Sequence, residues 1–214
     1  MKRSLLFFLF VCCSSTNLKS QNDSVLCAEN CKPADGMYLK WEDFRTQHSI
    51  AKESIDSKYD KSHLDFLNKA MKEKTVTFSS NGIKTRMETS KIWGFFQNGY
   101  LFLNYNGEFY RVPTFGSISY LIAVVEVINP GGGYYTPGYG MMNTPYKTDE
   151  VRSFLMNYYD GTIRPFSQAE AEELISRDKD LFTEYNALKR KQRKEQIARY
   201  IRKYNERNPI YFLK

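Results

Sequence analysis

Three Asn-Gly pairs, each lying between short segments of strand-like composition, are the feature that most restricts how this chain folds. They stand at positions 81–82, 98–99 and 106–107. A two-residue type I′ hairpin turn needs positive φ at both central residues, which Asn and Gly adopt more readily than other residues. Aromatic and β-branched residues are frequent in the five segments around these pairs: 75–79, 83–87, 91–96, 100–105 and 108–112. The pattern predicts an antiparallel β-meander.

The chain after the meander is expected to contain a buried strand, a large loop and a further hairpin. Residues 117–128 form an apolar run whose β-branched content favours a strand. Residues 130–146 contain five glycines and three prolines, a composition that fits no regular element. That segment is also too long for an ordinary hairpin turn. Asp160-Gly161 predicts a turn between strands at 151–159 and 162–166.

Two helices are predicted near the C-terminal end. Ser167 and Glu170 have the spacing of a capping box, which favours a short helix over 169–175. A longer helix is expected from about Asp178 to Asn205. Its apolar stripe consists of Leu181, Tyr185, Leu188, Ile197, Ile201 and Tyr204. We therefore predict an α+β fold, in which an antiparallel β-meander or partial barrel is followed by a long C-terminal α-helix that packs on it.

The first twenty residues have the layout of a secretory signal peptide. Lys2 and Arg3 precede an apolar run at 5–11, and small polar residues follow. That run is shorter than the roughly 20 residues of a membrane-spanning helix, so we expect export and cleavage. The alternative is lipid attachment at Cys13, as in bacterial lipoproteins. The predicted organisation is a signal peptide at 1–20, an irregular N-terminal segment at 21–36, a β-rich domain at 37–166 and a C-terminal helical segment at 167–214.

Two cysteines remain after the leader, Cys27 and Cys31, in a Cys-x-x-x-Cys arrangement. An oxidising compartment favours a local disulfide between them, with free thiols as the alternative. A metal site needs further ligands, and the two histidines, His48 and His63, have no ligand spacing. The sequence therefore predicts neither a metal nor a cofactor.

Positive charge is concentrated near the C-terminus. Residues 167–214 hold 12 basic and 8 acidic side chains. The gap in the apolar stripe contains five cations: Lys189, Arg190, Lys191, Arg193 and Lys194. Clustered Lys and Arg side chains attract anionic lipid headgroups, acidic glycans or nucleic acid. Export and the lack of a DNA-reading motif argue against nucleic acid. The alternative is a solvated helix surface without a ligand.

The glycine-rich loop at 130–146 provides a second candidate surface through Tyr134, Tyr135 and Tyr139. Tyrosine side chains on a loop stack on sugars or anchor a protein partner, because they bring a large contact area at low entropic cost. The alternative is a loop that binds nothing. The run of three glycines is not a phosphate-binding loop, since the Gly-Lys-Ser/Thr ending is missing.

Sequence signatures of enzymes are weak in this chain. Gly116-Ser117 lacks the flanking residues of a nucleophile elbow. The adjacent acids at 42–43 and 149–150 point to opposite faces if they lie in strands. We therefore favour an exported, non-catalytic envelope or surface protein that binds a protein partner, a glycan or a membrane face. The alternative is an envelope hydrolase whose site is assembled from scattered residues.

Two short motifs resemble those of a known family. The segment 35–39 reads Asp-Gly-Met-Tyr-Leu and is followed by Glu-Asp-Phe at 42–44, while Ile-Trp-Gly-Phe at 92–95 is followed by Asn-Gly at 98–99. This part of the chain, about residues 35–128, resembles exported proteins of Bacteroidota that are described only as a domain of unknown function. The resemblance implies a periplasmic or outer-surface location and assigns no catalytic residues.

Overall fold

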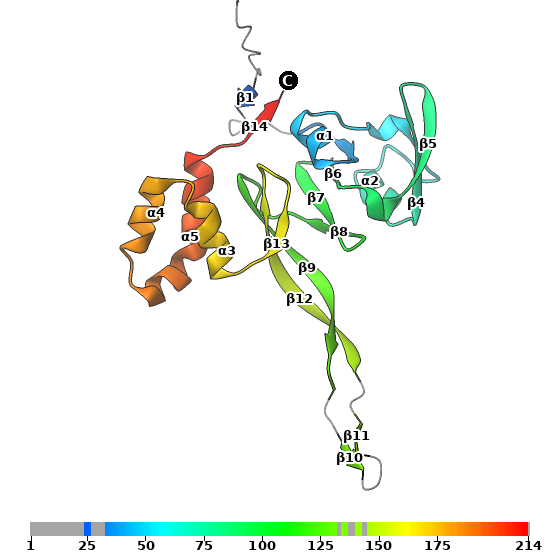
Figure 1. Cartoon of the computed structure of the whole chain (residues 1–214). Helices are drawn as coiled ribbons and strands as arrows, with labels where there is room; N and C mark the ends of the chain where they lie inside the picture. Colours follow the sequence, from blue (N-terminus) through cyan, green and yellow to red (C-terminus); the bar gives the residue numbers. More distant parts are fainter. Residues whose placement is uncertain (1–23, 27–32, 132–133, 137–139, 143–144, 214) are drawn as a thin grey trace, which may run out of the picture.

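The computed structural model describes residues 24–26, 33–131, 134–136, 140–142 and 145–213. It confirms the predicted α+β fold, in which antiparallel sheets are followed by the C-terminal helix α5 (Arg190–Arg207). Figure 1 shows a group of helices on one side, small sheets on the other, and one long β-hairpin that projects away from both. The base of that hairpin packs against the helices and against the sheets, so it joins a helical lobe to a larger β-rich lobe.

A four-stranded antiparallel sheet forms the centre of the larger lobe, with the strand order β2-β6-β7-β8. Its strands are β2 (Gly36–Tyr38), β6 (Gly94–Gln97), β7 (Tyr100–Tyr105) and β8 (Glu108–Arg111). Asn98-Gly99 and Asn106-Gly107 form the turns between the last three strands, and φ at these four residues lies between 54° and 90°. The predicted Asn-Gly hairpin turns are therefore confirmed.

The third Asn-Gly pair belongs to a separate three-stranded sheet, so the five predicted strands are divided between two sheets. This sheet consists of β3 (Ile55–Asp56), β4 (Thr75–Ser80) and β5 (Ile83–Glu88). A 3-10 turn at Thr89–Lys91 follows β5 and replaces the expected start of the next strand. The Thr89 hydroxyl donates to the Glu73 carbonyl at 2.6 Å, and the Thr89 amide donates to the Lys74 carbonyl at 3.1 Å. These bonds turn the chain away from β5.

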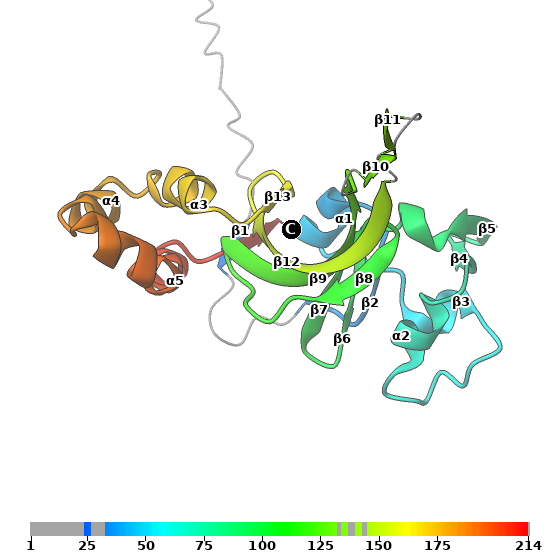
Figure 2. The same ribbon diagram turned by 90° about the horizontal axis from the view of Figure 1, so that it is seen from below.

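The projecting hairpin is formed by β9 (Ile118–Asn129) and β12 (Tyr146–Asn157), which pair over their full length. Figure 2 shows it curving across the four-stranded sheet. Two short strands, β10 (Tyr134–Thr136) and β11 (Gly140–Met142), pair with each other near its tip. Part of the expected loop at 130–146 is therefore regular structure, because the long hairpin brings both ends of this segment together.

The strand after the hairpin and the first helix follow their local sequence signals. Asp160-Gly161 lies in the turn that leads from β12 to β13 (Ile163–Pro165), as predicted. The Ser167 hydroxyl accepts a hydrogen bond from the Glu170 amide at 3.1 Å and so caps α3 (Gln168–Ile175). The predicted N-terminal cap of this helix is confirmed.

The long helix expected over 178–205 is two helices, α4 (Lys179–Asn186) and α5, with a break at 187–189. The break lets the Tyr185 ring of α4 pack against the Tyr200 ring of α5, with centroids 5.0 Å apart. In one straight helix, Tyr185 and Tyr200 would lie roughly 22 Å apart along the axis, because each residue adds about 1.5 Å. The break therefore allows the apolar stripe to fold back on itself and bury both rings.

Both ends of the described chain meet in a small sheet that the sequence did not predict. β14 (Tyr211–Leu213) pairs with β1 (Ser24–Leu26), which lies in the segment 21–36 that was expected to be irregular. Phe212 of β14 is buried, and its ring lies 5.6 Å from that of Phe44, which is also buried. The chain thus returns from the helical lobe to the core of the larger lobe, where burial of Phe212 stabilises the pairing.

Three clusters of buried side chains support these elements. The first lies between the four-stranded sheet and the hairpin and includes Leu103 and Leu121. The second joins the helices to the base of the hairpin through Ile118 and Leu155. The third packs α2 (Phe66–Ala70) against the three-stranded sheet. Both the helical lobe and the larger lobe therefore have a buried hydrophobic core.

Candidate functional site

Four of the five cations that the sequence predicts as a binding surface lie exposed at the start of α5. These are Lys189, Arg190, Lys191 and Lys194. Lys191 lies 4.0 Å from Glu195 of the same helix, and such an exposed pair contributes little to stability. The other three form no ion pair with any residue that the structure describes. Their charges remain available to a ligand.

Arg193, the fifth predicted cation, belongs to the core of the helical lobe. Its guanidinium lies 3.8 Å from the Glu172 carboxylate of α3 and donates to the Asn186 side chain of α4 at 3.2 Å. The Tyr185 hydroxyl donates to the same carboxylate at 2.9 Å. Burial and this carboxylate raise the pKa of Tyr185 to about 12. Arg193 therefore links the three helices and is not free to bind a ligand.

Two further exposed cations lie along α5, and the sequence analysis did not include them among the candidate surface residues. Arg199 and Arg202 lie on the solvent side of the helix, where the 3.6-residue period places them near Lys191 and Glu195. That period is the signal that would have found them. We call the five exposed cations without an ion pair among the described residues the basic surface: Lys189, Arg190, Lys194, Arg199 and Arg202.

Cations on the other side of α5 are paired with acids of α4 and its N-cap. Lys203 lies 2.5 Å from Glu184, and the Arg207 guanidinium lies 2.6 Å from Asp178. The α5 region thus carries cations that are paired with acids beside α4 and five exposed cations that form no ion pair with a described residue. The five exposed cations leave a positive potential at the surface of the helical lobe.

The predicted tyrosine surface is only partly placed. The backbone of Tyr134 and Tyr135 lies in β10, near the tip of the projecting hairpin (Figure 1). Four residues of the sequence analysis lie outside the described part of the chain: Tyr139, Cys13, Cys27 and Cys31. The tyrosine contacts, the lipid anchor and the disulfide therefore stay predictions.

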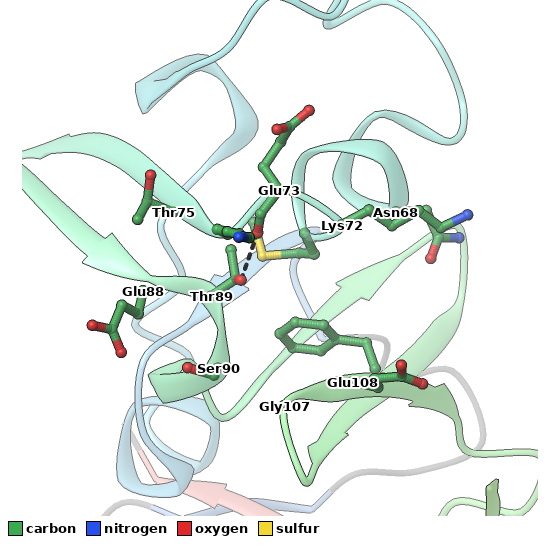
Figure 3. A pocket seen from close by; sticks show the side chains of 12 residues that line it. Asn68, Lys72, Glu73, Thr75, Glu88, Thr89, Ser90, Gly107 and Glu108 are labelled. Carbon is green, nitrogen blue, oxygen red and sulfur yellow. Dashed lines mark hydrogen bonds between the residues drawn. The ribbon is translucent and has the colours of Figure 1, made fainter. Parts of the chain in front are cut away.

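A cleft that the sequence did not suggest opens between the two sheets of the larger lobe (Figure 3). Its volume is about 750 Å³. Three connections that are distant in the sequence form its walls, and they contribute residues from 68–75, 88–90 and 107–109. No local pattern links these connections, because they meet only through the packing of the two sheets.

Two carboxylates at this cleft already have partners within the protein. Glu73 lies 2.8 Å from Lys58 and accepts a hydrogen bond from the Tyr59 hydroxyl at 2.6 Å, and Figure 3 shows its side chain directed away from the cleft. The hydrogen bonds from Lys58 and Tyr59 lower the pKa of the Glu73 carboxyl. Glu88 lies 3.3 Å from Lys91. A general acid needs a raised pKa, so the environment of Glu73 does not favour that role.

Neither a metal centre nor a known relative indicates the function. Among the described residues, no group of three or more His, Cys, Asp or Glu side chains is arranged to hold a metal ion. Within the same part of the chain, no helix is both long and apolar enough to cross a membrane. Comparison with protein-family models, curated proteins and solved structures finds no match, so the function has to be inferred from the surfaces of the chain itself.

Proposed function

We propose that this chain is an exported, non-catalytic envelope protein that binds anionic membrane surfaces through its basic surface. The observation that carries the proposal is the set of five exposed cations on one helical lobe, none of which forms an ion pair with a described residue. The predicted signal peptide at 1–20 and the resemblance to exported proteins support delivery to the envelope. An anionic surface there would neutralise the unpaired charge.

The basic surface has enough charge for reversible adsorption. Each Lys or Arg beside an anionic membrane contributes about 1 kcal/mol, so five contribute about 5 kcal/mol. That energy corresponds to roughly three to four powers of ten in the partition constant. The attraction decays over a Debye length of about 8 Å at physiological ionic strength, so binding should weaken steeply as salt is added.

The shape of the basic surface favours a charged plane as its ligand. Lys189 is the N-cap of α5 and the other four cations are exposed along the helix, so they offer charge to a ligand from solvent. The apolar side chains of α5, such as Ile197 and Ile201, are buried against the protein. They are therefore not available to insert into a bilayer as those of a surface-lying amphipathic helix are. Electrostatic contact with lipid headgroups is consistent with both features.

Co-sedimentation of the mature chain with vesicles that contain phosphatidylglycerol tests this proposal. Replacing the five cations of the basic surface by Gln should abolish binding and leave thermal unfolding nearly unchanged, because Gln is almost as good a helix former as Lys or Arg. Arg193 stays in place, since it links the helices. A matched control makes the same charge change outside the helical lobe, at Lys40, Lys52, Lys84, Lys91 and Lys147.

The proposal requires salt-sensitive binding that is lost in the basic-surface variant and kept in the control. Equal loss in both variants would show a general effect of net charge and would refute a specific surface. Absence of vesicle binding by the unmodified chain would refute the membrane as the ligand. Retention on a heparin column without vesicle binding would instead assign the basic surface to an acidic glycan.

A further inference from the structure

The cleft between the two sheets is held in shape by hydrogen bonds among the connections that form it. The Asn104 side chain donates to the carbonyls of Thr89 and Ser90 at 3.2 and 3.1 Å and accepts from the Gly107 amide at 2.9 Å. The buried Thr89 hydroxyl ties the same connection to the Glu73 carbonyl. The walls are therefore set before a ligand binds, which lowers the entropic cost of binding.

Polar side chains on the rim of the cleft have free hydrogen-bonding capacity. Four of them form no hydrogen bond or ion pair through the side chain with any described residue: Asn68, Lys72, Lys74 and Ser90. They offer amide, ammonium and hydroxyl donors, and Figure 3 shows Asn68 and Ser90 on opposite sides of the cleft. Glu108 accepts one hydrogen bond from the Tyr110 hydroxyl at 2.9 Å and keeps further lone pairs for a ligand.

The cleft also has an apolar component that suits part of a small molecule. Met71 is 4% exposed, and the half-buried Phe109 packs against Phe95 with ring centroids 5.3 Å apart. The volume of about 750 Å³ lies within the range of small-ligand sites, about 300–1,000 Å³. A purely apolar ligand would remove water from the charged rim without replacing its hydrogen bonds. The ligand therefore needs both C–H surface and many polar groups.

We propose that this cleft binds a sugar unit of a glycan, as a second site separate from the basic surface. Each sugar hydroxyl both donates and accepts hydrogen bonds, so it can pair with the Asn68 amide, the Ser90 hydroxyl and the Glu108 carboxylate. The C–H face of the sugar ring lies against the apolar side chains. Lys72 and Lys74 add a preference for a sugar that carries a carboxylate, because their ammonium groups have no acidic partner among the described residues.

Saturation-transfer NMR with a defined set of trisaccharides tests this inference. The probes are the trisaccharides of glucose, mannose, galactose, N-acetylglucosamine and glucuronic acid, each added to the full mature chain. At least one should receive saturation from the protein, and Ser90→Trp should abolish the transfer by filling the cleft. Ser80→Trp, at an exposed position at the end of β4, is the matched control and should bind as the unmodified chain does.

A milder pair of variants keeps the test valid if Ser90→Trp disturbs folding. Asn68→Ala and Lys72→Ala remove side chains that form no hydrogen bond or ion pair with any described residue, so thermal unfolding should not change. Asn68→Ala should weaken every bound sugar about tenfold, whereas Lys72→Ala should weaken only the glucuronate. No transfer to any of the probes, or transfer that survives both Ser90→Trp and Asn68→Ala, would overturn the proposal. The basic-surface variant should retain sugar binding, which separates this test from the membrane test.

Discussion

Replacing Asn205 by Ala is expected to loosen the contact between the helical lobe and the projecting hairpin. The Asn205 side chain accepts a hydrogen bond from the Ile118 amide and donates one to the Ile118 carbonyl, both at 2.8 Å. The Asn205 side chain therefore pairs with the backbone amide and carbonyl of Ile118 in β9, as the backbone of a neighbouring strand would. The contact is close, because a Cβ atom on Gly116 would lie 2.6 Å from the Asn205 side chain.

The size of the effect follows from the two lost hydrogen bonds. Each contributes about 1 kcal/mol net, and a buried backbone group left without a partner costs about 1–3 kcal/mol. Ile118 is buried, although Asn205 itself is half-buried, so water can compensate in part. Ala is the better helix former and offsets about 0.5 kcal/mol. We expect Asn205→Ala to lower the free energy of unfolding by about 3 kcal/mol, or the melting temperature by about 6–12 °C.

Urea unfolding followed by far-UV circular dichroism measures this loss. Glu206→Ala is the matched control, since Glu206 is the exposed neighbour in the same helical turn and should change the free energy of unfolding by less than about 0.5 kcal/mol. A loss in Asn205→Ala as small as that of the control would refute the reasoning. It would mean that water replaces both hydrogen bonds without cost.

Two further predictions concern acid stability and export. Burial raises the pKa of Asp178, but hydrogen bonds from the Leu181 amide and from Arg207 and Asn208 outweigh it and lower that pKa below its usual value. The ionised carboxylate therefore adds stability above about pH 4 that is lost as the pH falls through the lowered folded-state pKa. Asp178→Asn keeps a capping oxygen but should flatten the acid side of the stability curve, and an unchanged acid side would contradict this. Mass spectrometry of the envelope-fractionated chain should find an N-terminus between residues 13 and 22, whereas an intact Met1 would disprove export with cleavage.

The sequence by itself determined the features whose energy is local. The Asn-Gly pairs form hairpin turns because few other residues adopt positive φ at low cost. Ser167 begins a helix because its hydroxyl reaches the amide of Glu170, three residues further along. The composition of the strands and the apolar stripe of the C-terminal region likewise predict an α+β fold without any knowledge of long-range contacts.

Tertiary structure alone decided how these units combine and which surfaces stay free. The pairing of β1 with β14, the break at 187–189 and the division of the strands into two sheets depend on apolar faces that meet across long stretches of sequence. Arg193 and Lys194 are neighbours in the chain, yet one is tied to the core of the helical lobe and the other is free in solvent. Helix packing sets that difference, because one residue of helical rotation turns a side chain by about 100°. The cleft likewise exists only where three distant connections are brought together by the packing of two sheets.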